Sequence, residues 1–273
     1  MKIVSWNVNG IRSVFRTTFR EWLKSADPDI ICLQEVRADH AELSSEFTEV
    51  DGYYAFFNSG LRKGHSGVVV YTKAKPILVE TKLGIERFDD EGRCLKLTFK
   101  DFTLFNFYIP NGGREKENMG YKLNVYQKLF PILKSIARQN VILAGDFNIA
   151  HTEMDLHYPK QNQNSTMFTP DERKQITALL DLDYIDAFRY KYPEKRQYTW
   201  WSYAFNSREK DTGWRIDYFF VTKTILPLVE DVFMERGVAG SDHGPCDIIL
   251  NKNFDIVDRP VYTKKETQSS IFA

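Results

Sequence analysis

The 273-residue sequence has only three cysteines, and they lie far apart at Cys32, Cys94 and Cys246. So few cysteines argue against a disulfide-built scaffold, and we expect all three to be reduced thiols in the core. No apolar run approaches the roughly 20 residues that a membrane-spanning helix needs. The first residues, MKIVSWNVNG, lack the charged region and apolar core of a secretory signal. The sequence therefore predicts a soluble cytoplasmic protein.

The chain also lacks an excess of charge, because 37 Lys and Arg residues balance 37 Asp and Glu residues. Neutrality argues only weakly against nucleic-acid binding, since exposed charges act over about 10 Å at 0.1 M salt. A local cluster of basic residues matters more than the average. One such cluster recurs at every fourth residue, at Arg12, Arg16, Arg20 and Lys24, and would form a positive stripe if the segment is helical.

Short apolar runs rich in Val, Ile, Phe and Tyr recur along the chain, which is 42% hydrophobic and 14% aromatic. Strands are expected at KIVSW, DIICLQ, YYAFFN, GVVVYTK, PILVETKL, CLKLTFK, FTLFNFYI, VILAGD, YTWWSY, RIDYFFVT and CDIIL. The run LKLTFKDFTLFNFYI predicts a hairpin that turns at Lys100 and Asp101. The continuously apolar NVILAGD predicts a central strand that is buried on both faces.

Apolar residues at helical spacing predict helices between these strands. They are expected at residues 15–25, 121–139 and 169–182. Pro131 should kink or divide the second of them, and Thr169 is a candidate N-cap for the third.

Many strands, several helices and a hairpin predict an α/β protein. The expected architecture is a four-layer sandwich of two stacked mixed β-sheets flanked by α-helices. One catalytic domain is expected over residues 1–251. The polar, proline-containing residues 252–273 are expected to form an extended C-terminal tail.

Several apolar runs end in a polar side chain, and these ends carry the candidate chemistry. The residues are Asn7, Asn9, Glu35, Tyr108, Asn111, Asp146, Asn148, Asp217, Asp242 and His243. A core has little reason to collect so many acidic groups unless a cation or a reaction needs them. Oxygen donors without a Cys–His ligand spacing favour a hard cation, Mg²⁺ or Mn²⁺, over zinc. Such a cation among carboxylates typically handles phosphate oxygens.

A series of motifs follows in order from about Lys2 to Leu250. They are SWNVNGIR, LQE, GHSGVVVY, EGRC, YIPNGG, LAGDFNIAH, FTPDER, YTWWSY, GWRIDYFF and GSDHGP. The series resembles the exonuclease III family of abasic-site (AP) DNA endonucleases, in the endonuclease/exonuclease/phosphatase superfamily. GDFN alone indicates only the superfamily, whereas GWRIDYFF with YTWWSY and YIPNGG is much more specific to the DNA-repair branch.

The resemblance implies a Mg²⁺-dependent (or Mn²⁺-dependent) hydrolase that incises double-stranded DNA on the 5′ side of an abasic site in base excision repair. Cleavage would leave a 3′-hydroxyl, and 3′–5′ exonuclease and 3′-end-cleaning activities stay open. Glu35 would be the principal metal ligand, with Asn9 and Asp242 nearby. Some relatives carry an aspartate at position 9, so Asn9 leaves metal preference open.

Further roles follow from the same resemblance. Asp146 would align or deprotonate the attacking water, with Asn148 beside it and Tyr108 as the alternative proton handler. His243 would contact a scissile phosphate oxygen and would be held by Asp217. Asn7 and Tyr108 would steady the same region.

The resemblance also implies a set of DNA contacts. Trp200, Trp214 and Ile216 match an apolar pocket for a flipped-out abasic sugar, which would resist a normal nucleotide. A tryptophan that alternates into the core is the structural alternative for Trp200 or Trp201. The other implied contacts are Arg12, Gly64, His65, Arg93, Asn111, Arg114 and Asn162.

Other interpretations stay open from the sequence. The small Ala204 would widen the pocket, so incision at deoxyuridine or an oxidised base is the alternative specificity. RNA processing or hydrolysis of lipid or inositol phosphates fits the DNA-branch motifs less well. A DNA-binding module without activity would have lost a carboxylate or His243. GSDHGP places Ser, Asp and His side by side, but a serine hydrolase draws its triad from distant segments and the chain lacks a GxSxG elbow.

The segment QSSIF, Gln268–Phe272, resembles short peptides that dock on bacterial sliding clamps. A clamp is therefore a candidate partner, alongside duplex DNA. We expect a monomer without membrane contact, which in a prokaryote would lie with the nucleoid.

Overall fold

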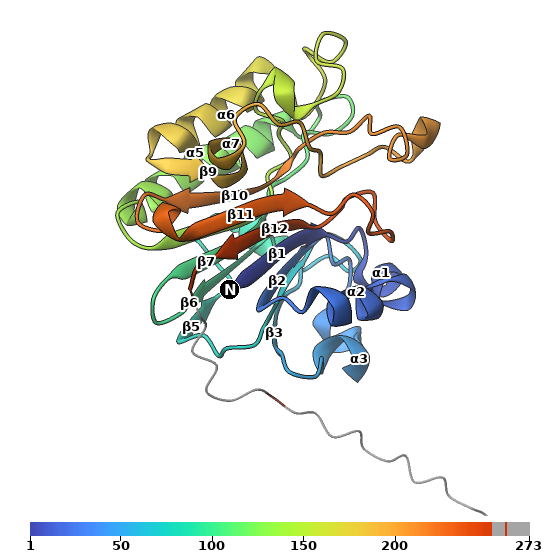
Figure 1. Ribbon diagram of the computed structural model, residues 1–273, viewed down its shortest axis with the longest axis vertical. Helices are drawn as coiled ribbons and strands as arrows, with labels where there is room; N and C mark the ends of the chain where they lie inside the picture. The colour runs from blue at the N-terminus through green and yellow to red at the C-terminus, as the bar shows by residue number, and fades with distance from the viewer. Residues whose placement is uncertain (253–259, 261–273) are drawn as a thin grey trace, which may run out of the picture.

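The computed structural model describes residues 1–252 and Pro260, and two six-stranded β-sheets pack face to face in it (Figure 1). The first sheet has the order β11 (Val229–Met234), β12 (Cys246–Leu250), β1 (Lys2–Asn7), β2 (Ile30–Gln34), β4 (Val68–Thr72) and β3 (Tyr54–Asn58). The second has the order β5 (Leu78–Glu80), β6 (Cys94–Thr98), β7 (Thr103–Tyr108), β8 (Val141–Asp146), β10 (Asp217–Thr222) and β9 (Tyr184–Asp186). Parallel pairs β1–β2 and β7–β8 lie among antiparallel ones, so both sheets are mixed.

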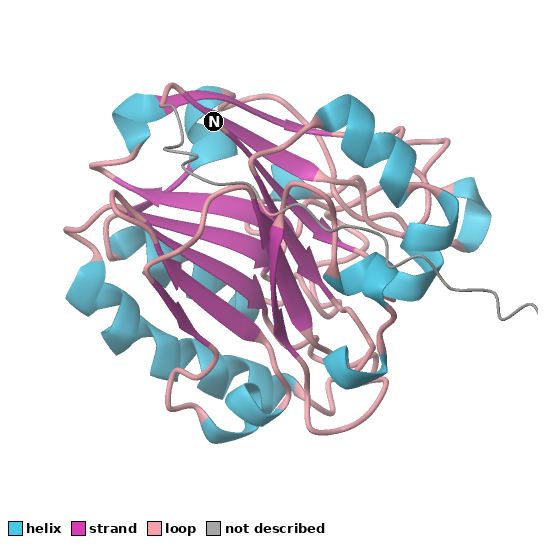
Figure 2. Ribbon diagram, turned by 90° about the horizontal axis from the view of Figure 1, so that it is seen from below, coloured by secondary structure: helices cyan, strands magenta, loops and turns pink. Residues whose placement is uncertain are grey.

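Helices cover the outer face of each sheet (Figure 2). On the first sheet lie α1 (Ile11–Thr17), α2 (Phe19–Ala26) and α3 (Ser45–Thr48). On the second lie α4 (Glu86–Asp90), α5 (Met119–Ile136) and α6 (Pro170–Asp181), and α7 (Ala187–Lys191) contacts β10 and β11. The short 3₁₀ helices are η1 (His40–Glu42), η2 (Glu153–Asp155), η3 (Ala204–Asn206) and η4 (Leu226–Leu228). The predicted four-layer sandwich is confirmed.

The two sheets are joined by an apolar core and by one buried polar cluster. The inner faces contribute a continuous set of apolar side chains from β1, β2, β4, β6, β7, β8 and β10. Within it, Nε2 of Gln34 donates to Oδ1 of Asn106 at 2.8 Å and to Oγ of Ser5 at 3.0 Å. Nδ2 of Asn106 donates in return to main-chain oxygens of β2 and β4. These directional bonds fix how the sheets lie on each other, which apolar packing alone specifies less tightly.

Several sequence predictions are confirmed. Strands β6 and β7 form the predicted antiparallel hairpin around Lys100 and Asp101. All six residues of β8 are buried between β7 and β10. Thr169 caps α6 in a capping box with Glu172. The three cysteines are buried and unpaired.

The helical segment predicted over residues 15–25 is confirmed except at Thr18, where the chain breaks into two helices. The hydroxyl of Thr17 bonds to main-chain oxygens of the preceding turn, a contact that disfavours continuation of a helix. The basic residues of the predicted stripe are therefore divided between α1 and α2. They do not lie on one helical face.

Two further predictions need correction. The helix α5 continues through Pro131 without division. Both Pro131 and Gln127, whose carbonyl loses its helical partner, are exposed, so water can satisfy that group. The segment YTWWSY is not a strand, because only Trp200 forms isolated bridges, to Trp214 and to His243. The backbone of this segment pairs with two separate segments of the chain, so it adds a strand to neither sheet.

Within the residues that the structure covers, no helix has both the length and the apolar character for crossing a membrane. The candidate clamp peptide Gln268–Phe272 lies outside the described residues, as does most of the expected tail.

Candidate active site

Several strand ends meet at one rim of the sandwich. Asp146, the last residue of β8, pairs in register with Tyr108 at the end of β7 and with Asp217 at the start of β10. Asn7 ends β1 in the facing sheet, and Glu35 directly follows β2. Each parallel pair delivers its carboxyl ends to one edge of its sheet, and β1 packs against β8. The topology thus brings together polar residues that are far apart in the sequence.

The side chain of Asn7 connects the two sheets at this rim. Its Nδ2 donates to Oε2 of Glu35 at 3.0 Å and to Oδ2 of Asp146 at 2.9 Å. Asn148 donates its main-chain N–H to Oδ1 of Asp146 at 2.8 Å and its Nδ2 to Oδ2 at 3.1 Å. Burial, followed by the charge of Asp217, raises the pKa of Asp146 to about 7. A carboxylate with this pKa can accept a proton near neutral pH.

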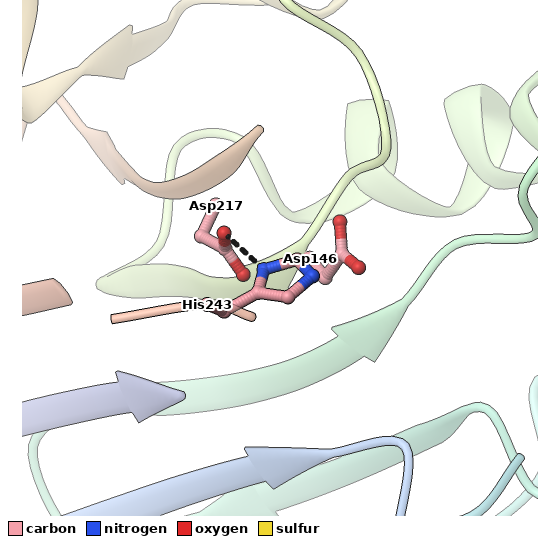
Figure 3. Close-up of side chains that lie close together, drawn as sticks. All are labelled: Asp146, Asp217 and His243. Atoms are coloured by element: carbon pink, nitrogen blue, oxygen red, sulfur yellow. Dashed lines mark hydrogen bonds and ion pairs between the residues drawn. The ribbon is translucent and has the colours of Figure 1, made fainter. Parts of the chain in front are cut away.

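His243 and Asp217 form a buried pair beside Asp146. Nδ1 of His243 lies 2.9 Å from Oδ2 of Asp217, and the imidazole stands between the two aspartates (Figure 3). Burial opposes a charge on the imidazole, but the Asp217 carboxylate outweighs it and raises the pKa of His243 to about 10. The ring is therefore protonated at neutral pH. Its backbone is fixed by Trp6, whose Nε1 donates to the His243 carbonyl at 3.0 Å.

Ser241 has a larger role than that of a simple turn residue. Its hydroxyl donates to the carbonyl of Asn7 at 2.7 Å and accepts the N–H of His243 at 3.2 Å. The loop that carries His243 is thereby anchored to the end of β1. Because this hydroxyl is engaged with the main chain, the neighbouring Ser, Asp and His of GSDHGP do not form a hydrolase triad.

Glu35 lies at the mouth of the site in a strained backbone conformation. Its φ is 56°, and Asn9 at 46° and Asn148 at 53° share this left-handed region. Such residues gather at functional sites, where the surrounding fold holds them. Burial, followed by the carboxylate of Glu35 to which its hydroxyl donates, raises the pKa of Tyr108 well above its usual value. Arg37, which the sequence analysis did not identify, forms an ion pair with Glu35.

Arg93, which the resemblance implied as a DNA contact, is a buried residue next to Tyr108. Only 5% of the residue is exposed. It pairs with Glu91, donates to the Tyr108 carbonyl at 3.2 Å and lies 4.5 Å from the centre of the Tyr108 ring. Through these contacts, Arg93 restrains the position of Tyr108.

Asp242 follows Ser241 on the same loop, and its carboxylate is half-buried. Nδ2 of Asn9 donates to its Oδ1 and Nε1 of Trp200 to its Oδ2, both at 2.9 Å. Burial would raise the pKa of Asp242, but the charge of His243 and these N–H donors hold it below its usual value. Asp242 is therefore ionised and oriented.

Two groups of side chains have the donors for a cation. Asp146, Asp217 and His243 offer atoms within 4.8 Å of one another, but all three side chains are buried. Glu35 and Asp242 are only partly buried, and Asn7 and Asn9 each donate a hydrogen bond to one of these carboxylates. Mg²⁺ keeps several of its waters and prefers oxygen ligands, so it suits the second group better. No thiol competes there, because the cysteines lie elsewhere in the core.

An apolar patch lies beside these carboxylates. It consists of buried Ile216 and Phe168 with half-buried Trp200 and Trp214. The rings of Trp200 and Trp214 meet edge to face, with centres 6.2 Å apart. The two tryptophans of YTWWSY differ, because Trp201 is 1% exposed in the interior while Trp200 reaches the surface of the patch.

The remaining residues predicted to bind DNA lie in surface loops and at the start of α1. Arg12, Gly64 and Arg114 are exposed and His65 is half-buried. Asn111 donates from Nδ2 to Oδ1 of Asn148 at 3.0 Å, which ties its loop to the site. Asn162 donates to the carbonyl of Tyr158 at 2.8 Å and accepts from Ser165 at 3.0 Å, within its own turn.

A supporting residue that the sequence analysis missed is Lys122. Its Nζ is fully buried, donates to the carbonyl of Asn148 at 2.6 Å and pairs with Glu172 at 2.5 Å. A lysine on the apolar face of a helix, at the spacing of Tyr126 and Leu129, is the sequence feature that would have identified it.

Comparison with known proteins agrees with this geometry. Residues 4–243 match the Endonuclease/Exonuclease/phosphatase family. The chain is 39% identical over 254 residues to an exodeoxyribonuclease of Bacillus subtilis, covering 92% of this chain and 100% of that protein. It is 37% identical to the DNA repair nuclease APEX1 of Danio rerio, covering 92% and 82%. An AP endonuclease structure from Archaeoglobus fulgidus superposes with a TM-score of 0.85 at 29% identity, covering 92% and 100%.

The matched residues include the rim where Asp146, Asp217 and His243 meet. The chain therefore belongs to the endonuclease/exonuclease/phosphatase family, and within it to the exonuclease III type of AP endonucleases, which are hydrolases.

Proposed function

We propose that this protein is a Mg²⁺-dependent DNA repair phosphodiesterase that cleaves the backbone 5′ to an abasic site and leaves a 3′-hydroxyl. The observation that carries the proposal is the hydrogen-bonded path from Glu35 through Asn7 to Asp146, next to the His243–Asp217 pair. In the proposed function, this arrangement would supply a cation ligand, a proton acceptor and a cationic donor in one site. Hydrolysis of a phosphodiester needs these three functions together.

Asp146 is the proposed group that orients and deprotonates the attacking water. Its pKa of about 7 matches this task, and Asn7 and Asn148 hold both of its oxygens. Protonated His243 donates to a phosphate oxygen and offsets the negative charge that develops there. Tyr108 steadies the same oxygens, and it stays the alternative proton handler.

Glu35, Asn9 and Asp242 are proposed to hold the cation, Mg²⁺ or Mn²⁺. When bound, such an ion supplies Lewis-acid polarisation of a phosphoryl oxygen. Glu35 contributes a partly buried carboxylate, and Asn7 orients it. In this assignment the carboxylates of Glu35 and Asp242 bind the cation. Side-chain amides donate hydrogen bonds to phosphate oxygens without adding negative charge that would repel them.

The apolar patch is proposed to receive the flipped-out sugar. Trp200, Trp214 and Ile216 present mainly apolar surface, and the indole N–H of Trp200 is already bonded to Asp242, so an extruded sugar without a base fits them best. Ala204 is exposed and its side chain is small, which keeps incision at deoxyuridine or oxidised bases as the alternative specificity. An exonuclease activity from 3′ ends, by the same chemistry, is part of the proposal.

Duplex DNA is the proposed partner, and its backbone would lie along Arg12, Gly64, His65, Arg93, Asn111, Arg114 and Asn162. We further propose a monomer that acts in the cytoplasm, with residues 1–251 as the catalytic domain and residues 252–273 as its tail. The clamp contact through Gln268–Phe272 belongs to the same proposal. It is testable by comparing clamp binding with and without residues 268–273.

The central experiment is a panel of labelled duplexes that carry an abasic analogue, deoxyuridine, an oxidised base or no lesion. Each is incubated with Mg²⁺, with Mn²⁺ or with EDTA. We expect one nick 5′ to the abasic analogue, with a 3′-hydroxyl product, and no nick in EDTA. Equal cleavage of all four duplexes would contradict lesion specificity, and cleavage in EDTA would contradict the metal requirement.

A further inference from the structure

Both oxygens of Asp242 are held by N–H donors from distant parts of the chain. Asn9 binds one and the indole of Trp200 binds the other, each at 2.9 Å. The backbone is fixed as well, because the N–H of Trp201 donates to the Asp242 carbonyl at 3.0 Å. A carboxylate accepts up to about four hydrogen bonds or ligands. These two donors leave further lone pairs of the Asp242 carboxylate free to bind a cation. They also fix the direction in which the carboxylate presents those lone pairs.

The indole that donates to Asp242 is itself held by the apolar patch. Trp200 exchanges main-chain hydrogen bonds of 2.9 and 2.8 Å with Trp214, and the two rings meet edge to face. Trp200 also forms a bridge with His243, the residue after Asp242. Packing therefore sets the ring orientation that aims Nε1 at the carboxylate.

We propose that Trp200 is a positioning residue for the metal side of the site, in addition to its proposed place in the lesion pocket. Its indole N–H holds Asp242 in the orientation that receives the cation. This inference rests on the proposed function, because it requires Asp242 to take part in metal binding. Donors behind a metal ligand commonly matter in this way, since they fix the orientation of the ligand.

The arrangement has a consequence for lesion recognition. One hydrogen bond joins the surface that would receive the sugar to the carboxylate that would hold the cation. A sugar that moves the indole of Trp200 also changes the restraint on Asp242. Linkage then requires the cation and the pocket ligand to change each other's affinity by the same factor.

The test measures Mn²⁺ binding to the full-length protein without DNA, from the electron paramagnetic resonance signal of free Mn²⁺. Trp200→Phe keeps an aromatic ring in the patch and removes the N–H donor. We expect Mn²⁺ binding on the order of tenfold weaker, as for other donors behind metal ligands. The matched control is Trp22→Phe, which removes an indole-to-carboxylate bond of 3.1 Å to Glu235 outside the site. Its Mn²⁺ affinity should equal that of the wild type.

A double-mutant comparison separates positioning from general distortion of the patch. Asp242→Asn alone should weaken Mn²⁺ binding, and adding Trp200→Phe should then cost nothing more. A further loss in that background would show that Trp200 acts through other contacts, and it would overturn the inference. Thermal unfolding checks each variant, and Trp200→Leu replaces Trp200→Phe if that variant does not fold.

Two other outcomes are decisive. Unchanged Mn²⁺ affinity in folded Trp200→Phe overturns the inference while the proposed nuclease function stands. A wild-type protein that binds no Mn²⁺ contradicts the proposed metal site, and the inference falls with it.

Discussion

His243 and Asp217 form an imidazole–carboxylate pair that is removed from solvent, with 2.9 Å between Nδ1 and Oδ2 and exposures of 4% and 0%. Asp217 begins β10 of one sheet, whereas His243 lies in the loop before β12 of the other. Burial makes the pair depend on both members, because either charge alone would be uncompensated. Several expected effects of mutation follow from this and from the neighbouring contacts.

Replacing Asp217 with Asn should shift the pH dependence of cleavage. The negative charge of Asp217 raises the pKa of His243 to about 10, so its removal lowers that pKa toward or below the usual value of about 6.5. The imidazole then loses its proton at a lower pH, and the alkaline loss of activity begins earlier. We expect a rate near neutral pH on the order of 100-fold lower, measured by single-turnover nicking of an abasic duplex.

The control for this change is Asp183→Asn, which alters an exposed aspartate paired with Lys223. Its pH–rate profile should match that of the wild type. If the alkaline limb of the pH–rate profile lies at the same pH in Asp217→Asn as in the wild type, the proposed role of the pair is contradicted.

Asp146→Asn should separate DNA binding from cleavage. The amide is similar in shape but accepts no proton, so we expect cleavage to fall by roughly 10²- to 10⁴-fold, the usual contribution of a general base. The affinity for abasic duplex should change little, because the proposed DNA contacts lie at other residues. Single-turnover rates and a filter-binding titration check both statements. If Asp146→Asn cuts as fast as the wild type while Tyr108→Phe does not, Tyr108 is the proton acceptor.

Glu35→Gln should raise the Mg²⁺ concentration needed for half-maximal cleavage. The amide keeps the size of the side chain but loses the charge that attracts the cation, and we expect a shift of about 10- to 100-fold. A Mg²⁺ titration of nicking activity measures it. Glu46→Gln makes the same chemical change at an exposed residue paired with Arg20 and should leave the titration unchanged. Equal midpoints for Glu35→Gln and wild type would exclude Glu35 as a ligand.

Asp155 should make folding stability fall in acid. Burial alone would raise its pKa, but Arg215 at 2.8 Å and Arg189 at 2.6 Å hold that pKa well below its usual range. The unfolded chain, with a pKa near the usual value of about 3.9, takes up the proton more readily. The stabilisation is therefore present above about pH 4 and is lost as the pH falls below it.

Urea unfolding from about pH 3 to pH 7 measures this effect. We expect Asp155→Asn to lower stability at pH 7 by about 3 kcal/mol or more, because buried Arg215 loses a partner, and to flatten the acid dependence. Asp171→Asn alters an exposed aspartate that pairs with Lys174, and it should change neither the stability at pH 7 nor its dependence on acid. An equally steep acid loss in Asp155→Asn would assign the effect to another carboxylate.

The strands and several helix ends were predictable because their causes are local. The alternation of β6 and β7 and the continuous apolar run of β8 follow directly from which faces are buried. The cap of α6 needs only Thr169 and Glu172, three residues apart. The break at Thr18 was missed because it depends on side-chain hydrogen bonds to the backbone that compete with a good apolar pattern.

The site was predictable as a set of residue types, although the partners within it were not. Carboxylates and amides at strand ends, together with the family motifs, identified Asp146, Asp217 and His243. Nothing local in the sequence indicated that Arg93 would turn inward onto Tyr108, or that Lys122 would lie buried behind Asn148. Those contacts depend on which loop packs over which strand end.

The sequence by itself determined the α/β class, the family and the side chains of the proposed chemistry, because periodicity and motifs are properties of the residue order. Only the tertiary structure decided which donor faces which oxygen: Asn7 between Glu35 and Asp146, and Trp200 on Asp242. The reason is physical, since these contacts join residues from different sheets and loops. Their distances and burial, and hence the pKa of each group, exist only once the two sheets have packed together.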